Sequence, residues 1–204
     1  MSRGIHLVAV LVVCGAGIGA AQGRSSGESP FDRFDPVFRK YTKRYFGPAF
    51  DWRVFKAQGM AESRLDNSAR SRNGAQGIMQ LMPSTFEAIR SRAPDLQSVD
   101  DPEMNIAAGI HHNRALWKLW SGAATPLDQR HFMFASYNAG RTTIRRAQRV
   151  ALRARLDPTL WASIVTVSPR VYRWRQRQTL HYLRMIELWL SKLDDRGRMA
   201  RDTR

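Results

Sequence analysis

The spacing of apolar residues constrains the fold of this 204-residue chain more than any other feature. From Phe31 onward nearly every segment carries its apolar residues at helical spacing, and no run alternates in the manner of a half-buried strand. Connections between the segments are short, and no internal repeat is visible. With 43% apolar residues, the chain is long enough for one globular domain with a proper core, but too short for a second full domain. The sequence therefore predicts a single, mainly α domain.

Capping residues and prolines predict where the helices begin, because they satisfy or remove the free N–H groups of a first turn. The expected caps are Asp51 for a helix over 52–63, Ser84 with Glu87 as a capping box for the next, and Asp101 before Pro102 for a third. Further helices are expected at 126–138, 142–155 and 169–193. The last of these is long, basic and amphipathic, and it is expected to bury its apolar stripe against the domain.

The N-terminus has the layout of a secretory signal peptide. Arg3 precedes a small and apolar stretch from Leu7 to Ala21, so residues 1–21 are assigned to a signal cleaved after Ala21. An uncleaved inner-membrane anchor is the alternative, but a stretch of about 15 residues is shorter than the roughly 20 that a bilayer requires. Residues 22–30 are expected to form a flexible linker, 31–195 the folded domain, and 196–204 a basic tail. The predicted location is the periplasm.

Cys14 is the only cysteine and lies within the signal segment, so the exported domain is expected to contain no disulfide. Lipidation of Cys14 is disfavoured, because the bulky Val13 stands where a small residue normally precedes a lipidated cysteine.

The formal charge of +16 predicts an anionic partner, which could be nucleic acid, acidic lipid or a wall polymer with carboxylates. Composition does not choose among them. No zinc finger, Gly-rich phosphate loop or aromatic RNA-binding signature is present, and a signal peptide disfavours a nucleic-acid partner.

Four short motifs follow one another in the central part of the chain. They are Glu62-Ser63, residues 74–83 (GAQGIMQLMP), Asn105-Ile106 with Gly109, and residues 135–140 (ASYNAG). In this order they resemble the catalytic domain of the soluble lytic transglycosylases, over roughly residues 50–190. The resemblance implies a lysozyme-like helical domain with a groove for peptidoglycan glycan strands and no cofactor. A fifth element of that family, Glu-Thr-x-x-Tyr-Val, differs here because Gln178 replaces its glutamate, although Tyr182 is kept.

Glu62 is the expected catalytic acid. Cleavage of a glycosidic bond needs a proton donor at neutral pH, so the pKa of the carboxyl must lie well above the value of about 4.3 for free glutamate. Glu62 lies near the C-terminal end of its predicted helix, where the helix dipole disfavours an anion, and on the same face as Phe55 and Gly59. Both the dipole and apolar surroundings would raise its pKa.

Most glycosidases pair two carboxylates, but no second partner for Glu62 is evident. Asp66 is expected to form a loop, and Asp101 is explained by its cap. The resemblance implies chemistry that needs one carboxyl: Glu62 protonates the leaving oxygen, the N-acetyl group of MurNAc stabilises the positive centre, and Glu62 then deprotonates the C6 hydroxyl. The expected product is a 1,6-anhydro sugar, which makes the enzyme a lyase.

The resemblance also assigns substrate-binding roles. A position beside the acid is expected for Tyr182, and an apolar contact with a sugar face for Met79. The residues expected to orient Glu62 or the sugar groups are Ser63, Gln80, Tyr137 and Asn138.

No metal site is expected. His111 and His112 are adjacent, and adjacent helical side chains point about 100 degrees apart, which makes a poor joint ligand set.

Two alternatives remain open at the level of the sequence: a goose-lysozyme-like hydrolase that activates water with aspartates, and a non-catalytic wall-binding scaffold. The protein is expected to be a monomer. Association with an envelope secretion or wall-remodelling assembly is also left open.

Overall fold

The computed structural model describes residues 29–199. The signal segment, Cys14, most of the predicted linker and residues 200–204 lie outside the described residues. Within 29–199 the secondary structure is helical, and pairing between extended residues is limited to isolated bridges. The predicted mainly α class is confirmed. No helix in this part of the chain is both long and apolar enough to cross a membrane.

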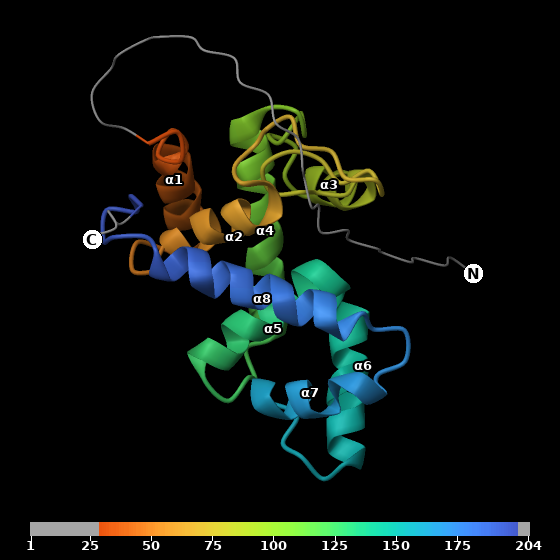
Figure 1. The fold of residues 1–204 in the computed structure, drawn as a ribbon. Coiled ribbons are helices and arrows are strands. Elements are labelled where there is room, and N and C mark those ends of the chain that lie inside the picture. The colour runs from red at the N-terminus through yellow and green to blue at the C-terminus, as the bar shows by residue number, and fades with distance from the viewer. Residues whose placement is uncertain (1–28, 200–204) are drawn as a thin grey trace.

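Eight α-helices and one 3-10 helix make up the described part of the molecule (Figure 1). They are α1 (Asp35–Phe46), α2 (Arg53–Ser63), α3 (Pro83–Arg90), α4 (Pro102–Leu119), α5 (Pro126–Ala139), α6 (Arg141–Arg153), α7 (Trp161–Val167), η1 (Ser168–Arg170) and α8 (Gln176–Ser191).

One of the predicted helix starts, that of α4, has the expected cap. Asp101 caps α4, because its Oδ1 accepts a hydrogen bond from the Met104 N–H at 2.8 Å and Pro102 supplies the first turn. The Oδ1 of Asp51 accepts from the Arg53 N–H at 3.0 Å, although the N-cap position itself is held by Trp52.

The predicted capping box of Ser84 and Glu87 is wrong. Helix α3 begins one residue before Ser84, at Pro83, and the extended Met82 occupies the N-cap position without a side-chain hydrogen bond. Proline needs no partner for the N–H that it lacks, so the first turn forms without a polar cap. Glu87 pairs instead with Arg90 on the exposed face of the helix.

The single helix predicted over 169–193 is also wrong. The chain forms α7 and η1 first, and α8 begins only at Gln176. Arg173 has a φ of 56°, which interrupts helical geometry, and the side chain of Trp174 turns into the core, where its Nε1 donates to the Thr179 hydroxyl at 3.0 Å. Burial of Trp174 explains why the apolar residues of this stretch continue across a break in the helix.

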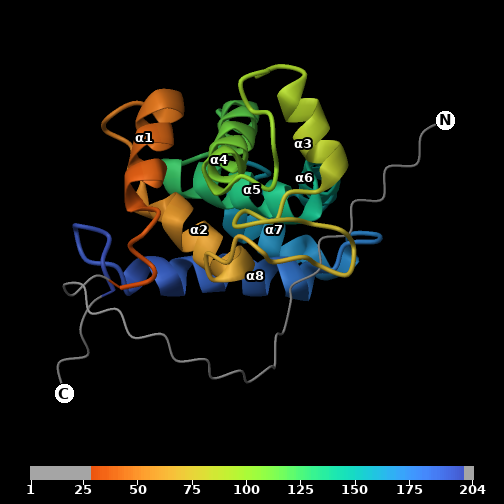
Figure 2. The ribbon, with the colours of Figure 1, turned by 90° about the horizontal axis from the view of Figure 1, so that it is seen from above.

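The core forms where α2, α4, α5 and α8 pack against one another, with α1 covering α2 and α4. Figure 1 and Figure 2 both show α8 alongside α2, although the two helices lie at opposite ends of the sequence. Gly59 allows close packing on α2, because a Cβ at this position would lie 2.8 Å from Leu65 and 3.2 Å from Phe38. Helix α2 is thus held centrally, with Glu62 in its last turn.

A buried cluster of charges joins the two ends of the described chain. Lys56 on α2 is fully buried, and its Nζ lies 3.0 Å from the Asp32 carboxylate and 2.6 Å from that of Asp35. It also donates to the Gly197 carbonyl at 2.7 Å. Residues 196–199 therefore contact the domain. The domain boundaries at residues 31 and 195 stay predictions.

Candidate functional site

The candidate site is built around Glu62, whose half-buried carboxyl accepts a hydrogen bond from the Tyr182 hydroxyl at 2.6 Å. Burial raises the pKa of Glu62 from 4.5 to about 8, and the hydrogen bond from Tyr182 opposes this rise. The carboxyl consequently keeps its proton at neutral pH. The rise in the pKa of Glu62 has the direction expected from the sequence, and desolvation is its main cause.

Behind Glu62 runs a chain of buried polar side chains. The Tyr182 hydroxyl accepts from Gln58 Nε2 at 3.0 Å, and Gln58 Oε1 accepts from Asn113 Nδ2 at 2.7 Å. The chain links α4, α2 and α8, so Tyr182 approaches Glu62 with its hydroxyl held in one orientation. Sequence reasoning missed Gln58 and Asn113. Both are polar residues within apolar helix faces, and this is the signal that could have identified them.

The loop between α2 and α3 borders the site on another side. Ser63 Oγ donates to the Ile78 carbonyl at 2.9 Å, which ties the end of α2 to the loop. The Tyr137 hydroxyl of α5 donates to the Met79 carbonyl at 2.8 Å. Burial and the nearby charge of Glu62 raise the pKa of Tyr137 well above 10, so this hydroxyl stays protonated.

Asn105 on α4 holds the same loop from behind. Its Oδ1 accepts from the Met79 N–H at 2.8 Å, and its Nδ2 donates to the carbonyls of Gln76 and Val99. Gly77 faces this side chain with a φ of 74°, and a Cβ there would overlap the Asn105 amide. The motif at residues 74–83 therefore forms a loop, and Asn105 of the next motif holds this loop through hydrogen bonds.

A cavity of about 530 Å³ opens beside the site, between the loop, α3, α4 and the start of α6. Glu62 itself is not part of the lining. Tyr137 lines the cavity and also donates to the Met79 carbonyl, so the cavity borders the loop between α2 and α3. Polar or charged side chains in the lining include Gln80, Arg92, His111, His112, Tyr137 and Arg141.

The remaining predicted residues have different surroundings from those expected. The Met79 side chain is fully buried and packs over Gly109, so in this conformation it is not available for contact with a sugar. Gln80 has a φ of 45°, and its Nε2 donates to the Gly77 carbonyl at 2.9 Å. Asn138 Oδ1 accepts from the Thr179 hydroxyl at 3.0 Å, which joins α5 to α8. Sugar contacts by these residues stay predictions.

The two carboxylates considered as partners of Glu62, Asp66 and Asp101, both have structural hydrogen bonds. Asp66 accepts two hydrogen bonds from Ser68, at 2.8 and 2.6 Å, and so forms the turn that was expected of it. Asp101 serves as the cap of α4. Among residues 29–199 there is also no group of three or more His, Cys, Asp or Glu side chains placed to hold a metal ion.

Comparison with known proteins identifies this arrangement. Residues 37–155 match the family model of the transglycosylase SLT domain. The membrane-bound lytic murein transglycosylase F of Desulfosudis oleivorans is 33% identical over 67% of this chain and 28% of its own length. The protein of the same name from Aliivibrio fischeri is 29% identical over 77% of this chain and 29% of its own length. The chain thus spans less than a third of these relatives.

Solved structures show the same fold. The 70 kDa soluble lytic transglycosylase of Escherichia coli superimposes with a TM-score of 0.58 at 22% identity, covering 76% of this chain and 23% of that one. A complex of the 70 kDa soluble lytic transglycosylase with bulgecin A gives a TM-score of 0.56 at 20% identity, covering 83% of this chain and 26% of that one. The lysozyme-like helical architecture expected from the motifs is confirmed.

Proposed function

This chain belongs to the transglycosylase SLT family, and from that premise we propose that it is a lytic transglycosylase that cuts the MurNAc-β-1,4-GlcNAc bond of peptidoglycan. The observation that carries the proposal is Glu62, a carboxyl with a pKa of about 8 that accepts a hydrogen bond from the buried Tyr182 hydroxyl at 2.6 Å. A carboxylic acid that is still protonated at neutral pH is what cleavage of a glycosidic bond requires.

In the first step, Glu62 donates its proton to the O4 oxygen of the departing GlcNAc, and the C1–O4 bond of MurNAc breaks. The N-acetyl group of the same MurNAc stabilises the electron-poor C1. Tyr182 donates its hydrogen bond to Oε1 of Glu62, which holds the carboxyl in one orientation. Tyr182 is therefore a positioning residue for the acid.

In the second step, the carboxylate of Glu62 removes the proton from the C6 hydroxyl, and O6 bonds to C1. The proton returns to Glu62, no water is consumed, and a 1,6-anhydro-MurNAc end forms. The attacking hydroxyl is tethered to the reacting sugar, so its effective concentration is high without a base to activate water. This route uses one carboxyl, and the structural hydrogen bonds of Asp66 and Asp101 support it.

The test is digestion of purified sacculi followed by mass spectrometry of the released muropeptides. We expect 1,6-anhydro ends, which weigh about 18 Da less than hydrolysed ends and do not accept borohydride, by the proton accounting of this chemistry. The Glu62→Gln variant should lose at least about 10² of the rate, because the amide cannot donate and recover a proton. Reducible MurNAc ends would instead assign the chain to the goose-lysozyme-like hydrolases.

We further propose that the protein acts as a monomer in the periplasm, after removal of residues 1–21. The relatives named as membrane-bound murein transglycosylases support a place in the cell envelope. N-terminal sequencing of the exported protein tests the cleavage site: a chain that begins at Gln22 is expected, and an intact Met1 would contradict it.

A further inference from the structure

The positive charge of the chain is concentrated in one segment. Residues 141–186 contain eleven arginines and a single acidic residue, Asp157, so this segment holds +10 of the total formal charge of +16. Asp157 is engaged with Thr159, because it accepts from both its N–H and its hydroxyl. The segment therefore has little internal compensation for its charge.

Four of these arginines form a row on α6. Arg141, Arg145, Arg149 and Arg153 lie four residues apart, so they share one face of the helix and extend over about 18 Å. All four side chains are exposed, and none of them has an ion-pair partner within residues 29–199. Like charges at this spacing repel one another, so the row is unfavourable for the helix itself. We refer to these residues as the arginine row.

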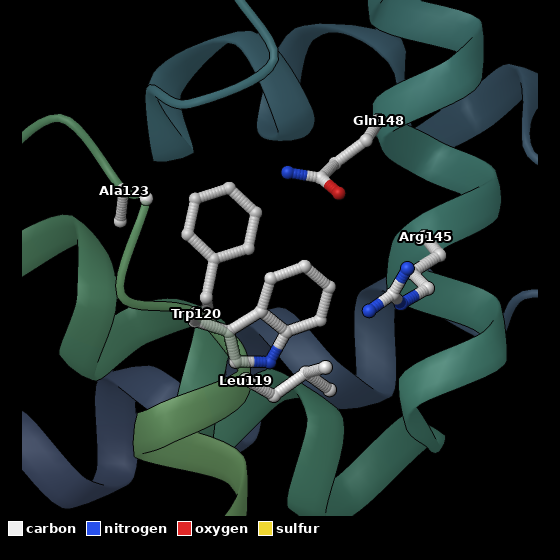
Figure 3. Close-up of a pocket in the computed structure, with 7 residues that line it drawn as sticks. Leu119, Trp120, Ala123, Arg145 and Gln148 are labelled. Atoms are coloured by element: carbon white, nitrogen blue, oxygen red, sulfur yellow. The ribbon is translucent and has the colours of Figure 1, made fainter.

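The arginine row starts at the candidate site and leads away from it. Arg141 lines the same cavity as Gln80 and Tyr137. Arg145 borders a second cavity of about 230 Å³ and lies over the ring of Trp120, 5.8 Å from its centroid (Figure 3). Figure 1 shows α6 continuing from there alongside α7.

We propose that the arginine row binds the carboxylates of the peptide branches on the wall polymer whose glycan strand occupies the groove. This inference rests on the proposed function. If the glycan strand lies in the cavity beside Arg141, its peptide branches extend along Arg145, Arg149 and Arg153. Guanidinium groups bind carboxylates through two parallel hydrogen bonds, which suits arginine for such a surface. Charge complementarity and continuity with the cavity favour this partner over an acidic lipid surface or a nucleic acid.

The experiment measures sedimentation of the full chain with purified sacculi, in the Glu62→Gln background so that the sacculi stay intact. The test variant carries Arg145→Gln, Arg149→Gln and Arg153→Gln, and it keeps Arg141. We expect its affinity at low salt to fall about tenfold, since each exposed charge pair contributes modestly and three are lost. The difference should disappear on sacculi whose carboxylates have been converted to amides.

A matched control removes the same charge from other faces of the molecule. It carries Arg33→Gln, Lys43→Gln and Lys118→Gln, three exposed cations of which Arg33 lies over the ring of Phe34, as Arg145 lies over Trp120. We expect its affinity for sacculi to stay within about twofold of the parent. An equal loss in both triple variants would overturn the proposal, because net charge alone would then explain binding. If the test variant unfolds, Arg149→Gln/Arg153→Gln repeats the measurement without touching an aromatic contact.

Further measurements separate this proposal from its alternatives. With Glu62 restored, the parent and the test variant should cut peptide-free glycan strands at the same rate. If neither cuts them or sacculi, the proposed function is wrong, while sedimentation still decides the arginine row. The proposal would be contradicted if the test variant bound native sacculi as well as the parent does but no longer bound anionic phospholipid vesicles or duplex DNA. The arginine row would then be assigned to lipid or nucleic acid.

Discussion

At Glu62, burial and a hydrogen bond shift the pKa of the carboxyl in opposite directions. Burial disfavours the carboxylate, and the hydrogen bond from Tyr182 favours it, with a resulting pKa of about 8. We expect kcat/KM on soluble glycan strands to be flat from about pH 5 to 7 and to fall about tenfold per pH unit above 8, as the acid loses its proton. Rates measured across this range check the prediction. An additional loss of activity below pH 5 would indicate a second carboxylate acting as a base.

The same proton makes the stability of the fold depend on pH. Between about 4.5 and 8 the folded protein holds a proton on Glu62 that the unfolded chain releases, so this group favours folding at low pH and costs stability as the pH rises toward 8. Glu62→Gln removes that cost. After a discount for partial exposure, we expect a gain on the order of 2 kcal/mol at pH 7, about 5 °C in Tm, and little gain at pH 4.5. Thermal unfolding at the two pH values measures this, and an equal gain at both would contradict it.

The sequence predicted that Tyr182 lies beside the candidate acid Glu62, but it did not predict the polar side chains behind Tyr182. Glu62 and Tyr182 stand in motifs whose spacing marks them, whereas Gln58 and Asn113 stand in no recognised motif. Their hydrogen bonds join three helices. Which polar residues meet across helices depends on packing, and a linear pattern does not encode it. For Met79 the motif predicted a contact with a sugar. In the structure its side chain is buried by packing against Gly109, which the motif does not encode.

Among the elements, the loop before α3 depends on Gly77 for two separate reasons. Its φ of 74° strains any other residue, and a Cβ would collide with the Asn105 amide that clamps the loop. We expect Gly77→Ala to destabilise the protein by about 3 kcal/mol or more and to reduce activity, since the loop carries the Met79 carbonyl that holds Tyr137.

Gly74 provides the control for that substitution. It has a φ of 86° in the same loop, but a Cβ there would meet no atom within 4 Å. Gly74→Ala should therefore cost only the backbone strain, about 1 kcal/mol. Urea unfolding of both variants checks the comparison, and equal losses would show that the Asn105 contact is unimportant.

Local capping signals predicted the start of α4 correctly but not that of α3, and the positions that tertiary contacts decide were predicted poorly. Asp101 with Pro102 started α4 as expected, because a cap acts on neighbouring residues. The stretch from 169 to 193 is predicted from the sequence as one helix, because its apolar residues keep helical spacing across the break at Arg173, and α7 before it is not predicted. Only the burial of Trp174 shows why the chain turns there.

At the scale of the whole molecule, Lys56 joins the segment before α1, α1 itself, α2 and the last described residues. Burial raises the pKa of Asp35 to about 6 even with Lys56 beside it. We expect Lys56→Met to cost about 3–5 kcal/mol at pH 7, because it leaves two carboxylates buried without a cation. The pKa of Asp35 should then rise further, so the loss should be smaller at pH 5, where the carboxyl takes up a proton.

Urea unfolding at pH 5 and pH 7 measures this difference. Adding Asp35→Asn to Lys56→Met should recover part of the loss at pH 7, since one uncompensated charge is then removed. A loss that is independent of pH, with no recovery in the double variant, would show that lost packing and not charge explains the effect.

The packing of α8 on α2 joins two segments that are made at different times during synthesis. The carboxyl of Glu62 and the hydroxyl of Tyr182 are separated by 120 positions, and α8, which supplies the hydroxyl, is the last helix within residues 29–199. A nascent or incompletely folded chain thus has its acid without the partner that orients it. In an enzyme of the proposed kind, the acid is therefore held in one orientation only after α8 has packed against α2.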